Sequence, residues 1–411
     1  MNDPRPPLKS LDDALAELLD RAVPALESER VSTFDADGRV LAQDVVSTLQ
    51  VPPQDNSAMD GYALRCADVA ATGALLPVSQ RIPAGSAGAA LQAGTAARIF
   101  TGAPIPPGAD AVIMQEDCET VAGLEAAIRV MTLPQPGQWI RRGGEDVRRG
   151  AVVLSKGELL TPAGIGLAAG IGMDTLLVAR RPRVALFSTG DELVMPGDVA
   201  PEQMKPGAIY NSNRFFLRAL LKRLGCEVTD LGIVPDRRDA TIDALRSASA
   251  QHDLILTSGG VSVGEEDHIK PAVQALGELS LWQIAIKPGK PFAYGRIGQA
   301  HFAGLPGNPV SSFITFLLLV RPFLRKLQGA TELAPKPIAL PAHFTWARAD
   351  KRREFLRVRR NAAGGLDLFA NQSSSVLTST VWGDGVVDNP PGQTISHGAT
   401  VQFISFAELL S

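Results

Sequence analysis

The chain has 411 residues, 45% of them hydrophobic and 20% charged, so it can bury large cores and is not a disordered protein. Forty Lys and Arg residues against 43 Asp and Glu residues leave a net charge of −3, which gives no overall electrostatic attraction for nucleic acid. At roughly 150 residues per domain, the length predicts about three domains. Glycine (39 residues) and proline (30 residues) are enriched, and we expect the glycines to mark ligand-binding loops.

The cysteines and the apolar runs indicate the compartment. Cys66, Cys118 and Cys226 are far apart and form no CxxC pair, so a disulfide framework or a zinc ribbon is not expected. The N-terminal stretch MNDPRPPLKS has no apolar core that would make it a signal peptide. The longest apolar run, Phe313–Val320, is far shorter than the ~18 residues that cross a membrane. We therefore expect a cytoplasmic protein that does not enter a membrane.

The first part of the chain predicts helices and short strands. A helix is predicted after Ser10, because leucines at 11, 15, 18 and 19 share one helical face and Ser10 with Asp13 can form a capping box. From 31 to about 140, β-rich pieces broken by Pro and Gly predict one or two small β modules. Thr161 and Pro162 predict the start of a second helix, because proline at the first helical position leaves no N–H group unpaired.

Residues 182–328 carry the clearest pattern, in which apolar strands alternate with helices. This pattern predicts a parallel, doubly wound sheet whose ligand-binding loops follow the strands. The predicted strands are 183–187, 227–234, 254–257, 281–286, 292–294 and 301–304, and the predicted helices are 214–224, 240–250, 269–276 and 310–327. After Gly329, a proline-containing linker leads into a C-terminal module of short strands.

Five loops of this segment combine glycine or proline with polar residues, and each of them follows a predicted strand. They are 188–192, 234–236, 257–267, 287–291 and 304–309. Glycines beside hydroxyl groups, as at Ser258, Gly259 and Gly260, let backbone N–H groups converge on a phosphate, and Lys287 and Lys290 add positive charge. A plain turn explains the first loop taken alone, but several such loops at one sheet edge indicate an anion site. No GxxxxGK[ST] motif occurs, so an ordinary P-loop nucleotidase is disfavoured.

Carboxylates in the same loops are candidate magnesium ligands. Asp191, Glu192, Asp236 and Asp267 offer the hard oxygen atoms that Mg²⁺ takes when it bridges a protein to substrate phosphates. The five histidines show neither HxH nor HExxH spacing, so a histidine metal site is not expected. No GxSxG motif supports a serine hydrolase.

Polar stretches outside the α/β segment are open to two interpretations. The stretch 55–62 is a candidate site or an Asx-rich turn, and 100–110 is a candidate site or a Pro/Gly connector. The stretch 140–146 has two arginines, two glycines and an acidic pair, and it is a candidate site or a solvated basic turn. The serine run 373–375 would by itself be a polar turn.

Taken in order, these stretches resemble the molybdopterin molybdenumtransferase family, the MoeA type that also forms the E domain of gephyrin. The matching stretches are DNSAMDGYA, RIFTGAPIPPGADAVIMQE, RRGGEDV, STGDEL, TSGGVSVGEEDH, AIKPGKPFAYG and GLPGNPVSS and, more weakly, KRREFLR and NQSSSVL. They extend from residue 55 to about 377. Any one of them is modest support, whereas seven long strings in one order are very specific.

The resemblance implies a multidomain α/β and β protein. Its central part would be a doubly wound molybdopterin-binding α/β domain III at 181–329, with β-rich N-terminal and C-terminal modules. The family plan implies a split domain I at 1–52 plus 141–180, a β-rich domain II at 53–140 and a β-rich domain IV at 330–411. The implied activity is the last step of molybdenum cofactor synthesis, in which molybdate is inserted into adenylylated molybdopterin and AMP is released with Mg²⁺ present.

The resemblance also implies roles for individual residues. The implied catalytic positions are Asp60, Thr101, Asp146, Glu192, Asp236 and Asp267. The last three would also hold Mg²⁺ or position the attacking water. The implied positions for the pterin phosphates and molybdate are Ser258, Gly259, Gly260, Lys287, Lys290, Arg352, Ser374 and Ser375. Arg352 and the two serines would form the molybdate pocket, because an oxyanion is held by a cation together with hydroxyl donors.

Family members are homodimers with an active site shared between subunits, so the loops at 55–146 are expected to face the loops at 188–310 of the partner subunit. A molybdopterin adenylyltransferase and apo-molybdoenzymes are implied partners, whereas nucleic acid and membrane are not. Two alternatives remain open. One is molybdopterin adenylyltransferase itself, whose relatives consist of the α/β domain alone, and the other is a non-catalytic scaffold of the same fold. The N-terminal stretches and the complete acidic loops favour the molybdenum-inserting enzyme.

Overall fold

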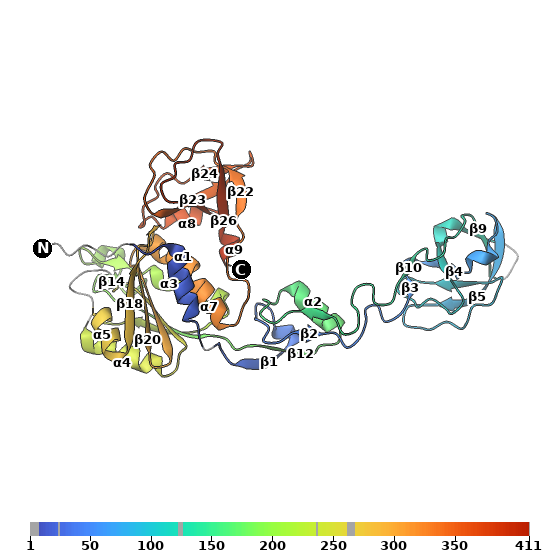
Figure 1. Cartoon of the computed structure of the whole chain (residues 1–411), viewed down its shortest axis with the longest axis horizontal. Coiled ribbons are helices and arrows are strands. Elements are labelled where there is room, and N and C mark those ends of the chain that lie inside the picture. Colours follow the sequence, from blue (N-terminus) through green and yellow to red (C-terminus); the bar gives the residue numbers. More distant parts are fainter. Residues whose placement is uncertain (1–7, 24, 122–125, 236, 261–267, 411) are drawn as a thin grey trace.

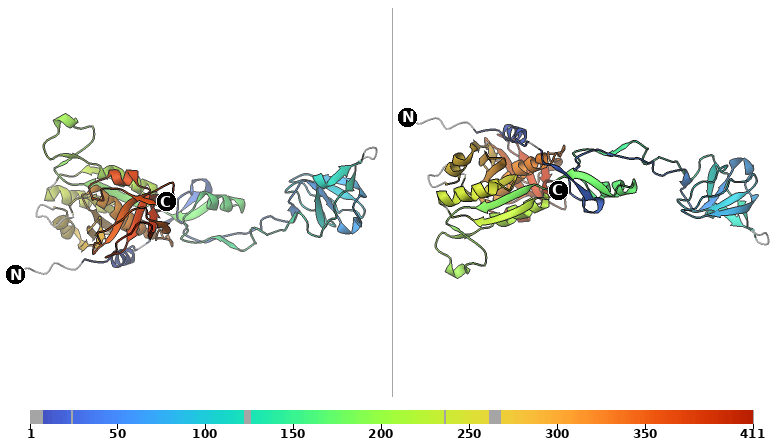
Figure 2. Two further views of the ribbon diagram at one scale, coloured as in Figure 1. Left: turned by 90° about the horizontal axis from the view of Figure 1, so that it is seen from above. Right: turned by 90° about the horizontal axis from the view of Figure 1, so that it is seen from below.

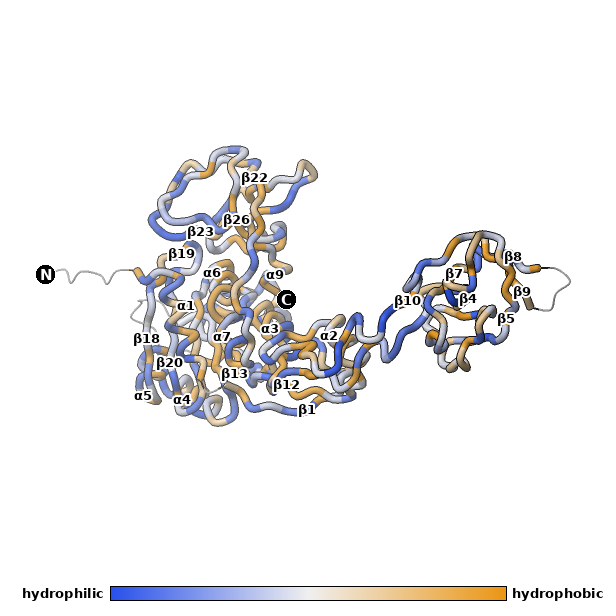
Figure 3. Tube along the Cα trace, turned by 45° about the vertical axis from the view of Figure 1, so that its right-hand side comes forward, coloured by the Kyte–Doolittle hydropathy of each residue, from blue (hydrophilic) through white to orange (hydrophobic). Residues whose placement is uncertain are grey.

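The computed structural model describes residues 8–23, 25–121, 126–235, 237–260 and 268–410, which form an elongated molecule (Figure 1). An α/β body lies at one end with a C-terminal body of strands against it, followed by a small middle body and then a far body at the other end (Figure 1). Hydrophilic residues predominate along the connection to the far body (Figure 3). Within these ranges, no helix has the length and hydropathy that a membrane crossing requires.

The far body is a six-stranded sheet in the order β7-β4-β6-β5-β9-β8, so the prediction of β-rich structure is confirmed here. Its strands are β4 (Gly61–Leu64), β5 (Ala74–Ile82), β6 (Ala96–Ile99), β7 (Ala111–Met114), β8 (Cys118–Thr120) and β9 (Ala127–Val130). Gly61 is required where β4 passes β7, because a Cβ atom there would overlap the carbonyl oxygen of Ile113.

The middle body is built from two segments that are distant in the sequence. Its elements are β1 (Ser28–Ser32), β2 (Val45–Val46), β11 (Val152–Leu154), α2 (Pro162–Gly170) and β12 (Thr175–Ala179). β1 pairs with β12 and β2 with β11, both antiparallel. The predicted helix start is confirmed, because the Thr161 side chain accepts a hydrogen bond from the Gly164 N–H. β3 (Asn56–Ser57) pairs with β10 (Ile140–Arg141) where the two segments enter the far body (Figure 1).

The sheet of the α/β body has the order β16-β13-β17-β21-β20-β18. Its strands are β13 (Arg183–Ser188), β16 (Glu227–Ile233), β17 (Leu254–Ser258), β18 (Glu278–Gln283), β20 (Pro291–Ile297) and β21 (Ala300–Leu305). The first four strands of the order are parallel, but β20 runs antiparallel to both of its neighbours. The prediction of a wholly parallel sheet is therefore wrong at β20. Only Gly298 and Gln299 connect β20 to β21, and so short a connection joins antiparallel strands.

Helices cover both faces of this sheet, as a doubly wound fold requires. They are α1 (Leu11–Asp20), α3 (Asn213–Arg223), α4 (Arg238–Ser249), α5 (Ile269–Leu276), α6 (Pro309–Thr315) and α7 (Arg321–Leu327). Alternate strand residues point to opposite faces, so Leu186 packs with α1, α3 and α7, whereas Phe187 packs with α4 and α5. The predicted helix after Ser10 is confirmed, since the Ser10 side chain accepts a hydrogen bond from the Asp13 N–H, and this helix packs on the α/β body.

The predicted helix 310–327 is interrupted by a π-helical turn, η5 (Phe316–Val320), between α6 and α7. Pro322 lies just after this turn. Proline has no N–H to donate along the helix, so the regular hydrogen-bond ladder cannot continue through it. Periodicity predicted the helix correctly but does not reveal the wider turn.

The C-terminal body is a β-sheet that reaches into the α/β body. Its elements are β22 (Ile338–Pro341), β23 (Arg353–Arg360), β24 (Leu366–Leu368), α8 (Thr378–Trp382), β25 (Gly385–Asn389), β26 (Thr400–Ser405) and α9 (Phe406–Leu410). The sheet order is β19-β23-β25-β26-β22, with β24 beside β23. β19 (Ile286–Lys287) comes from the α/β segment and pairs parallel with Arg353 and Glu354. This shared strand joins the two bodies.

The remaining short elements lie in loops. They are η1 (Thr33–Asp35), η2 (Cys66–Asp68), η3 (Gln115–Asp117), β14 (Leu193–Val194), η4 (Pro201–Gln203) and β15 (Ile209–Tyr210). β14 and β15 pair parallel, and the loop between them projects from the α/β body with η4 at its tip (Figure 2).

Candidate active site

A cavity of about 800 Å³ lies at the carboxyl ends of β13, β17 and β21, where a doubly wound sheet binds its ligand. Its wall is rich in hydroxyl and amide side chains, namely Ser188, Thr189, Tyr210, Asn211, Ser212, Asn213, Ser258, Asn308, Ser311 and Ser375. Glu192 is the one charged residue among the described residues of the lining. Ser375 comes from the C-terminal body, so both bodies contribute to the wall.

The Asn213 side chain connects the start of α3 with two other loops of the cavity by hydrogen bonds. Its amide nitrogen donates to Ser258 Oγ and to the Gly307 carbonyl, each at 2.7 Å. Ser258 Oγ in turn donates to the Pro306 carbonyl at 3.4 Å. The hydroxyl of Ser258 is thus engaged with the protein as well as lining the cavity. Sequence reasoning missed Asn213, although the run Asn211–Asn213 directly before a predicted helix was an available signal.

Gly259 and Gly260 bring bare backbone to the cavity wall. Their φ angles are +95° and +67°, a region that residues with a Cβ atom rarely adopt. A Cβ atom on Gly260 would also lie 2.5 Å from the Ile269 side chain. The predicted glycine loop therefore has glycine where the backbone conformation and the packing both require it.

Two buried polar atoms of the cavity make no hydrogen bond within the described part of the chain. Ser188 Oγ and Asn211 Nδ2 have no hydrogen-bond partner among the residues that the structure describes, although both residues line the cavity. Buried polar atoms are otherwise almost always paired. Both atoms are therefore available to a ligand. The Asn211 Oδ1 atom is occupied, because it accepts a hydrogen bond from the N–H of Arg214 in the first turn of α3.

The acidic residues expected to hold a metal are only partly described. Glu192 lines the cavity, and its carboxylate lies against Gly190, where a Cβ atom would be 2.5 Å from Glu192 Oε2. Asp236 and Asp267 lie outside the described residues. In the part of the chain that is described, no group of three or more His, Cys, Asp or Glu residues is arranged to hold a metal ion.

Four charged residues, here called the Lys287 cluster, meet where β19 joins the C-terminal body: Lys287, Asp350, Arg352 and Glu354. Lys287 Nζ lies 3.0 Å from Glu354 Oε1 and 3.4 Å from Asp350 Oδ2. Arg352 donates from Nε and Nη2 to the two Asp350 oxygens at 3.0 and 2.8 Å. These hydrogen bonds hold the pKa of the Asp350 carboxyl well below its usual range, and the charge of Lys287 lowers it further. Lys287 and Arg352, to which the resemblance gave separate roles, thus contact the same Asp350 carboxylate.

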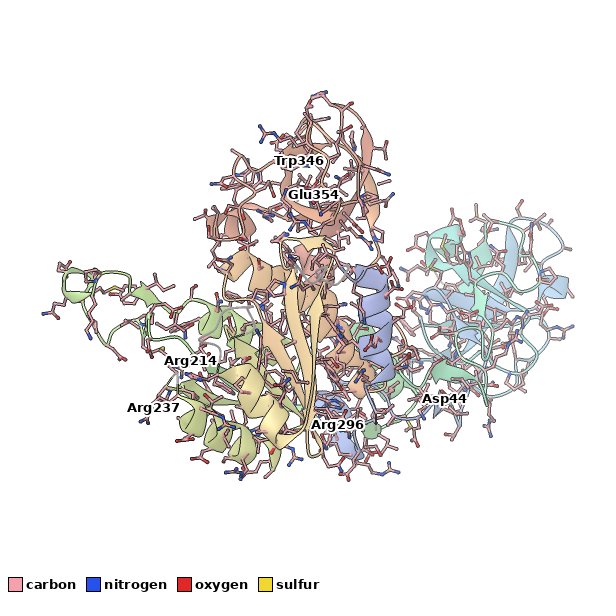
Figure 4. The ribbon with its side chains drawn as sticks, turned by 60° about the vertical axis from the view of Figure 1, so that its left-hand side comes forward. Asp44, Arg214, Arg237, Arg296, Trp346 and Glu354 are labelled. Atoms are coloured by element: carbon pink, nitrogen blue, oxygen red, sulfur yellow. The ribbon has the colours of Figure 1, made fainter. Side chains whose placement is uncertain are left out.

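Trp346 and Asn389 complete the surroundings of Glu354. Trp346 Nε1 donates to Glu354 Oε2 at 2.8 Å, and the two side chains lie together in the C-terminal body (Figure 4). Asn389 Nδ2 also donates to Glu354 Oε2, at 3.4 Å. Lys290 lies at the other end of the same loop and precedes Pro291, which lines the cavity. Sequence reasoning missed Trp346, Asp350 and Glu354, because nothing in their spacing reveals the shared strand.

Residues 373–375, here called the serine loop, are held in place by a buried arginine. Arg357 is 1% exposed and donates to the carbonyls of Ser373 and Phe355 and to Ser379 Oγ. Burial lowers the pKa of Arg357 to about 10. The carbonyl of Ser374 accepts a hydrogen bond from the Val310 N–H at the start of α6. The loop is therefore fixed to both bodies, and it presents Ser375 to the cavity.

Asp60 directly precedes β4 and Thr101 follows β6, so both lie in the far body, whereas the cavity belongs to the α/β body at the other end of the molecule (Figure 1). Asp60 Oδ1 accepts hydrogen bonds from the Thr101 N–H and hydroxyl at 2.8 and 2.7 Å, and these bonds lower the pKa of Asp60. Asp146 is exposed, and its N–H donates to Val51 O in the connection to the far body. A single chain therefore brings Asp60 and Thr101 together but does not bring either to the cavity.

Known proteins resemble this chain along most of its length. Three family models match it: the MoeA N-terminal region (domain I and II) over residues 9–172, a probable molybdopterin binding domain over 185–326 and the MoeA C-terminal region (domain IV) over 339–406. A Haemophilus influenzae protein named molybdopterin molybdenumtransferase is 42% identical over 336 residues, which cover 82% of this chain and 80% of that protein. A protein of the same name from Nostoc sp. is 36% identical and covers 97% of this chain and 94% of its own length.

Solved structures agree with the fold. A crystal structure of the molybdopterin biosynthesis moeA protein from Pyrococcus horikoshii OT3 matches with a TM-score of 0.83 and 29% identity, covering 97% of this chain and 100% of that one. This likeness and the family models confirm the predicted fold class of a central α/β domain between β-rich modules. The chain belongs to the molybdopterin molybdenumtransferase family.

Proposed function

We propose that this chain inserts molybdate into adenylylated molybdopterin and releases AMP, the last step of molybdenum cofactor biosynthesis. One observation carries the proposal: all three family regions, from residue 9 to residue 406, occur in one chain, and the second and third of them form a cavity lined by hydroxyl, amide and backbone groups. The chain is an enzyme of the transferase class. An adenylyltransferase is not favoured, because relatives that match over most of the chain are named as molybdenumtransferases.

The phosphate end of the pterin nucleotide is proposed to lie in the cavity. Ser212 and Asn213 line it at the amino end of α3, where the helix dipole favours an anion. The buried Ser188 Oγ and Asn211 Nδ2 atoms can supply further hydrogen bonds. Lys290, beside the cavity-lining Pro291, would offset the negative charge of the pyrophosphate, because the described wall contains no cationic residue.

Mg²⁺ fits the chemistry of this wall, since Glu192 offers the hard carboxylate oxygens that the ion prefers. We propose that Glu192 holds the ion together with Asp236 and Asp267. When bound, Mg²⁺ would neutralise phosphate charge that develops as AMP leaves. Gly190 keeps space for the Glu192 carboxylate, because a Cβ atom at this position would lie 2.5 Å from Oε2.

Molybdate is proposed to bind between the Lys287 cluster and the serine loop. Arg352 and Lys287 supply positive charge within one cluster, and Ser374 and Ser375 supply hydroxyl groups from a loop that Arg357 holds in place. A guanidinium group with hydroxyl donors suits a tetrahedral oxyanion.

A homodimer with a shared active site is proposed for the far-body residues. Asp60 and Thr101 form a prepared pair in the far body, yet they are remote from the cavity of their own chain (Figure 1). Asp60, Thr101 and Asp146 would then act on substrate bound in the partner subunit's cavity. A molybdopterin adenylyltransferase that supplies the substrate and apo-molybdoenzymes that receive the product are the proposed partners.

We also propose the four-domain division into 1–52 plus 141–180, 53–140, 181–329 and 330–411. Separate hydrophobic clusters support it: one joins both segments of the middle body, and others lie within the far body, the α/β body and the C-terminal body. Helix α1 packs on the α/β body, so the start of the proposed domain I also contacts domain III.

The direct test uses the purified full chain with adenylylated molybdopterin, molybdate and Mg²⁺. We expect AMP release and cofactor formation that require molybdate, with cofactor measured by reconstitution of an apo-molybdoenzyme. Consumption of ATP with free molybdopterin would instead identify an adenylyltransferase. Absence of both reactions would leave the scaffold as the better explanation.

The Asp60→Ala variant tests the proposed role of the far body. We expect it to abolish molybdenum insertion without loss of structure, because Asp60 is exposed and its contacts are confined to Thr101 and its surroundings. Glu116→Ala, which removes an exposed acid from the same body, is the matched control and should keep activity. A wild-type cofactor yield from Asp60→Ala would remove Asp60 from the mechanism.

A further inference from the structure

The guanidinium face of Arg352 is already occupied by an anion of the same chain. Asp350 uses both carboxylate oxygens, which accept from Arg352 Nε and Nη2 at 3.0 and 2.8 Å. The Arg352 N–H also donates to Asp350 Oδ1 at 3.0 Å. This two-point contact is the one that a tetrahedral oxyanion would make with an arginine. Asp350 and an incoming oxyanion therefore need the same donor atoms.

Asp350 also reaches the second cation of the cluster. Its Oδ2 lies 3.4 Å from Lys287 Nζ, so one carboxylate bridges Lys287 and Arg352. The Asp350 side chain is 19% exposed and the Arg352 side chain 26% exposed, so solvent and small ions can reach both. Asp350 thus occupies the position between two cations where an oxyanion would gain most.

Glu354 is placed differently, although it belongs to the same cluster. Its side chain is only 1% exposed and is fixed by Trp346 Nε1 at 2.8 Å and by Lys287 Nζ at 3.0 Å. Lys287, by contrast, is 37% exposed. Glu354 therefore holds Lys287 from the buried side, and the other side of the ammonium group remains accessible. A carboxylate in this position orients the lysine without blocking it.

We propose that Asp350 is a built-in competitor for the molybdate site, which must leave Arg352 when the oxyanion binds, and that Glu354 is a positioning residue that keeps Lys287 directed toward that oxyanion. This inference rests on the proposed function, specifically on the binding of molybdate by Arg352 and Lys287. It makes two acids of one cluster act in opposite directions: Asp350 weakens oxyanion binding, and Glu354 strengthens it.

The physical reason is competition at a high local concentration. A carboxylate two residues from the guanidinium group is always near it, so a free oxyanion meets few sites in which Arg352 is unoccupied. The observed affinity of a ligand falls by the fraction of sites that can bind it. The strongly lowered pKa of Asp350 means that this competitor stays ionised at any ordinary assay pH, so acid does not remove it.

The test is equilibrium binding of molybdate alone to the full-length wild-type chain and variants, measured by calorimetry at fixed salt. Asp350→Asn keeps the side-chain shape but loses the negative charge, and we expect it to bind molybdate roughly fivefold more tightly, as the loss of one modest ion pair allows. Glu354→Gln should bind roughly tenfold more weakly, because Lys287 loses its buried partner. Tighter binding cannot result from a damaged fold.

Asp384→Asn is the matched control. It removes one negative charge from the C-terminal body at an ion pair with Arg360 that lies apart from the cluster, and it should leave molybdate binding unchanged. A similar gain in Asp384→Asn would attribute the effect to net charge and overturn the proposal. Unchanged or weaker binding by a folded Asp350→Asn variant would overturn it as well.

The experiment also separates this inference from the proposed function. If Arg352→Gln binds molybdate as well as wild type does, molybdate is not held at Arg352, and both the molybdate site and the competitor role fail. If Arg352→Gln loses binding but Asp350→Asn gains none, the site stands and only the competitor role fails. In turnover assays, Asp350→Asn should lower the KM for molybdate with little change in kcat, whereas a merely structural role would lower kcat.

Discussion

The cavity and the Lys287 cluster both lie where the α/β body meets the C-terminal body, yet they hold their polar groups in opposite ways. In the cavity, neutral groups tie the loops, as Asn213 does for Ser258 and Gly307, and two buried polar atoms keep no partner in the described chain. In the cluster, two cations are matched by two carboxylates. Leaving a neutral polar group without a partner costs less free energy than leaving a buried charge without one, and the Glu354 carboxylate of the cluster is only 1% exposed. The cluster must therefore be paired before any ligand arrives.

The largest expected effect concerns the cavity backbone. Gly260→Val should destabilise the chain by about 3 kcal/mol and abolish nucleotide binding, because it combines a positive φ with a Cβ atom 2.5 Å from Ile269. Gly392→Val is the matched control, since Gly392 has φ +75° but no atom within 4 Å of an added Cβ. Urea unfolding measures both variants. Equal losses would show that the backbone angle alone matters and that close packing at the cavity does not.

The loss of stability in acid should arise from a buried histidine, His301, rather than from the cavity or the Lys287 cluster. Burial lowers the pKa of His301 from 6.5 to about 4, so the folded chain resists a proton that the unfolded chain accepts. Stability should therefore fall as the pH drops from about 6.5 toward 4, by on the order of 3 kcal/mol. The lowered pKa of Asp350 means that its contribution persists above about pH 4 and is lost only at still lower pH.

Unfolding at several pH values tests this assignment. His301→Gln should remove the loss of stability between pH 6.5 and 4.5, and Asp350→Asn should retain it. If the slope instead disappears in Asp350→Asn, the cluster rather than His301 is the acid-sensitive part of the chain.

A smaller effect on stability is expected at Asn213, whose neutral amide connects the loops of the cavity. Asn213→Ala leaves Ser258 Oγ and the Gly307 carbonyl without their donor, so we expect a loss of about 2 kcal/mol and weaker nucleotide binding. Asn308→Ala is a suitable comparison, because Asn308 lines the same cavity but its side chain makes no capping hydrogen bond at α6. A loss as large in Asn308→Ala would contradict a special role for Asn213.

The smallest effect on stability is expected at Arg357, whose charged side chain holds the serine loop. Arg357→Met removes three hydrogen bonds but also a buried cation, and the two contributions offset each other, so stability should change by less than about 1 kcal/mol. Molybdate binding should nevertheless weaken several-fold, because the serine loop loses its anchor. Thermal unfolding and calorimetry measure the two effects. A stability loss of about 2 kcal/mol or more would show that removing the Arg357 hydrogen bonds costs as much as removing those of Asn213.

Local signals in the sequence predicted the elements well. The Ser10 and Thr161 caps, the strands of the α/β body and α5 follow from side chains that act on their own neighbourhood. The glycine loop at 259–260 was also predictable, because no other residue suits a positive φ beside a ligand. These features depend on a few adjacent residues, and that is why a single sequence reveals them.

Features that depend on distant pairing were not predictable in this way. The antiparallel direction of β20 follows from the two-residue connection to β21, and the spacing of hydrophobic residues carries no information about strand direction. The Lys287 cluster exists because β19, which comes from the α/β segment, pairs with β23 of the C-terminal sheet, and no spacing between Lys287 and Glu354 reveals that pairing. Asp350 and Arg352 are neighbours in sequence, but their role depends on Lys287, which the fold brings from more than sixty residues away.

The crossing between the middle and far bodies has a topological consequence. The chain leaves at Val51 and returns at Val147, and these two residues exchange backbone hydrogen bonds of 2.8 and 3.1 Å. The chain therefore enters and leaves the far body at adjacent positions. The far body can be deleted by joining these two positions directly. A short linker between these positions should leave the cavity and the Lys287 cluster folded while it deletes Asp60 and Thr101. Such a shortened chain can be mixed with a full-length chain that carries a defective cavity. Recovery of activity would show that the far body of one subunit acts on the cavity of the other.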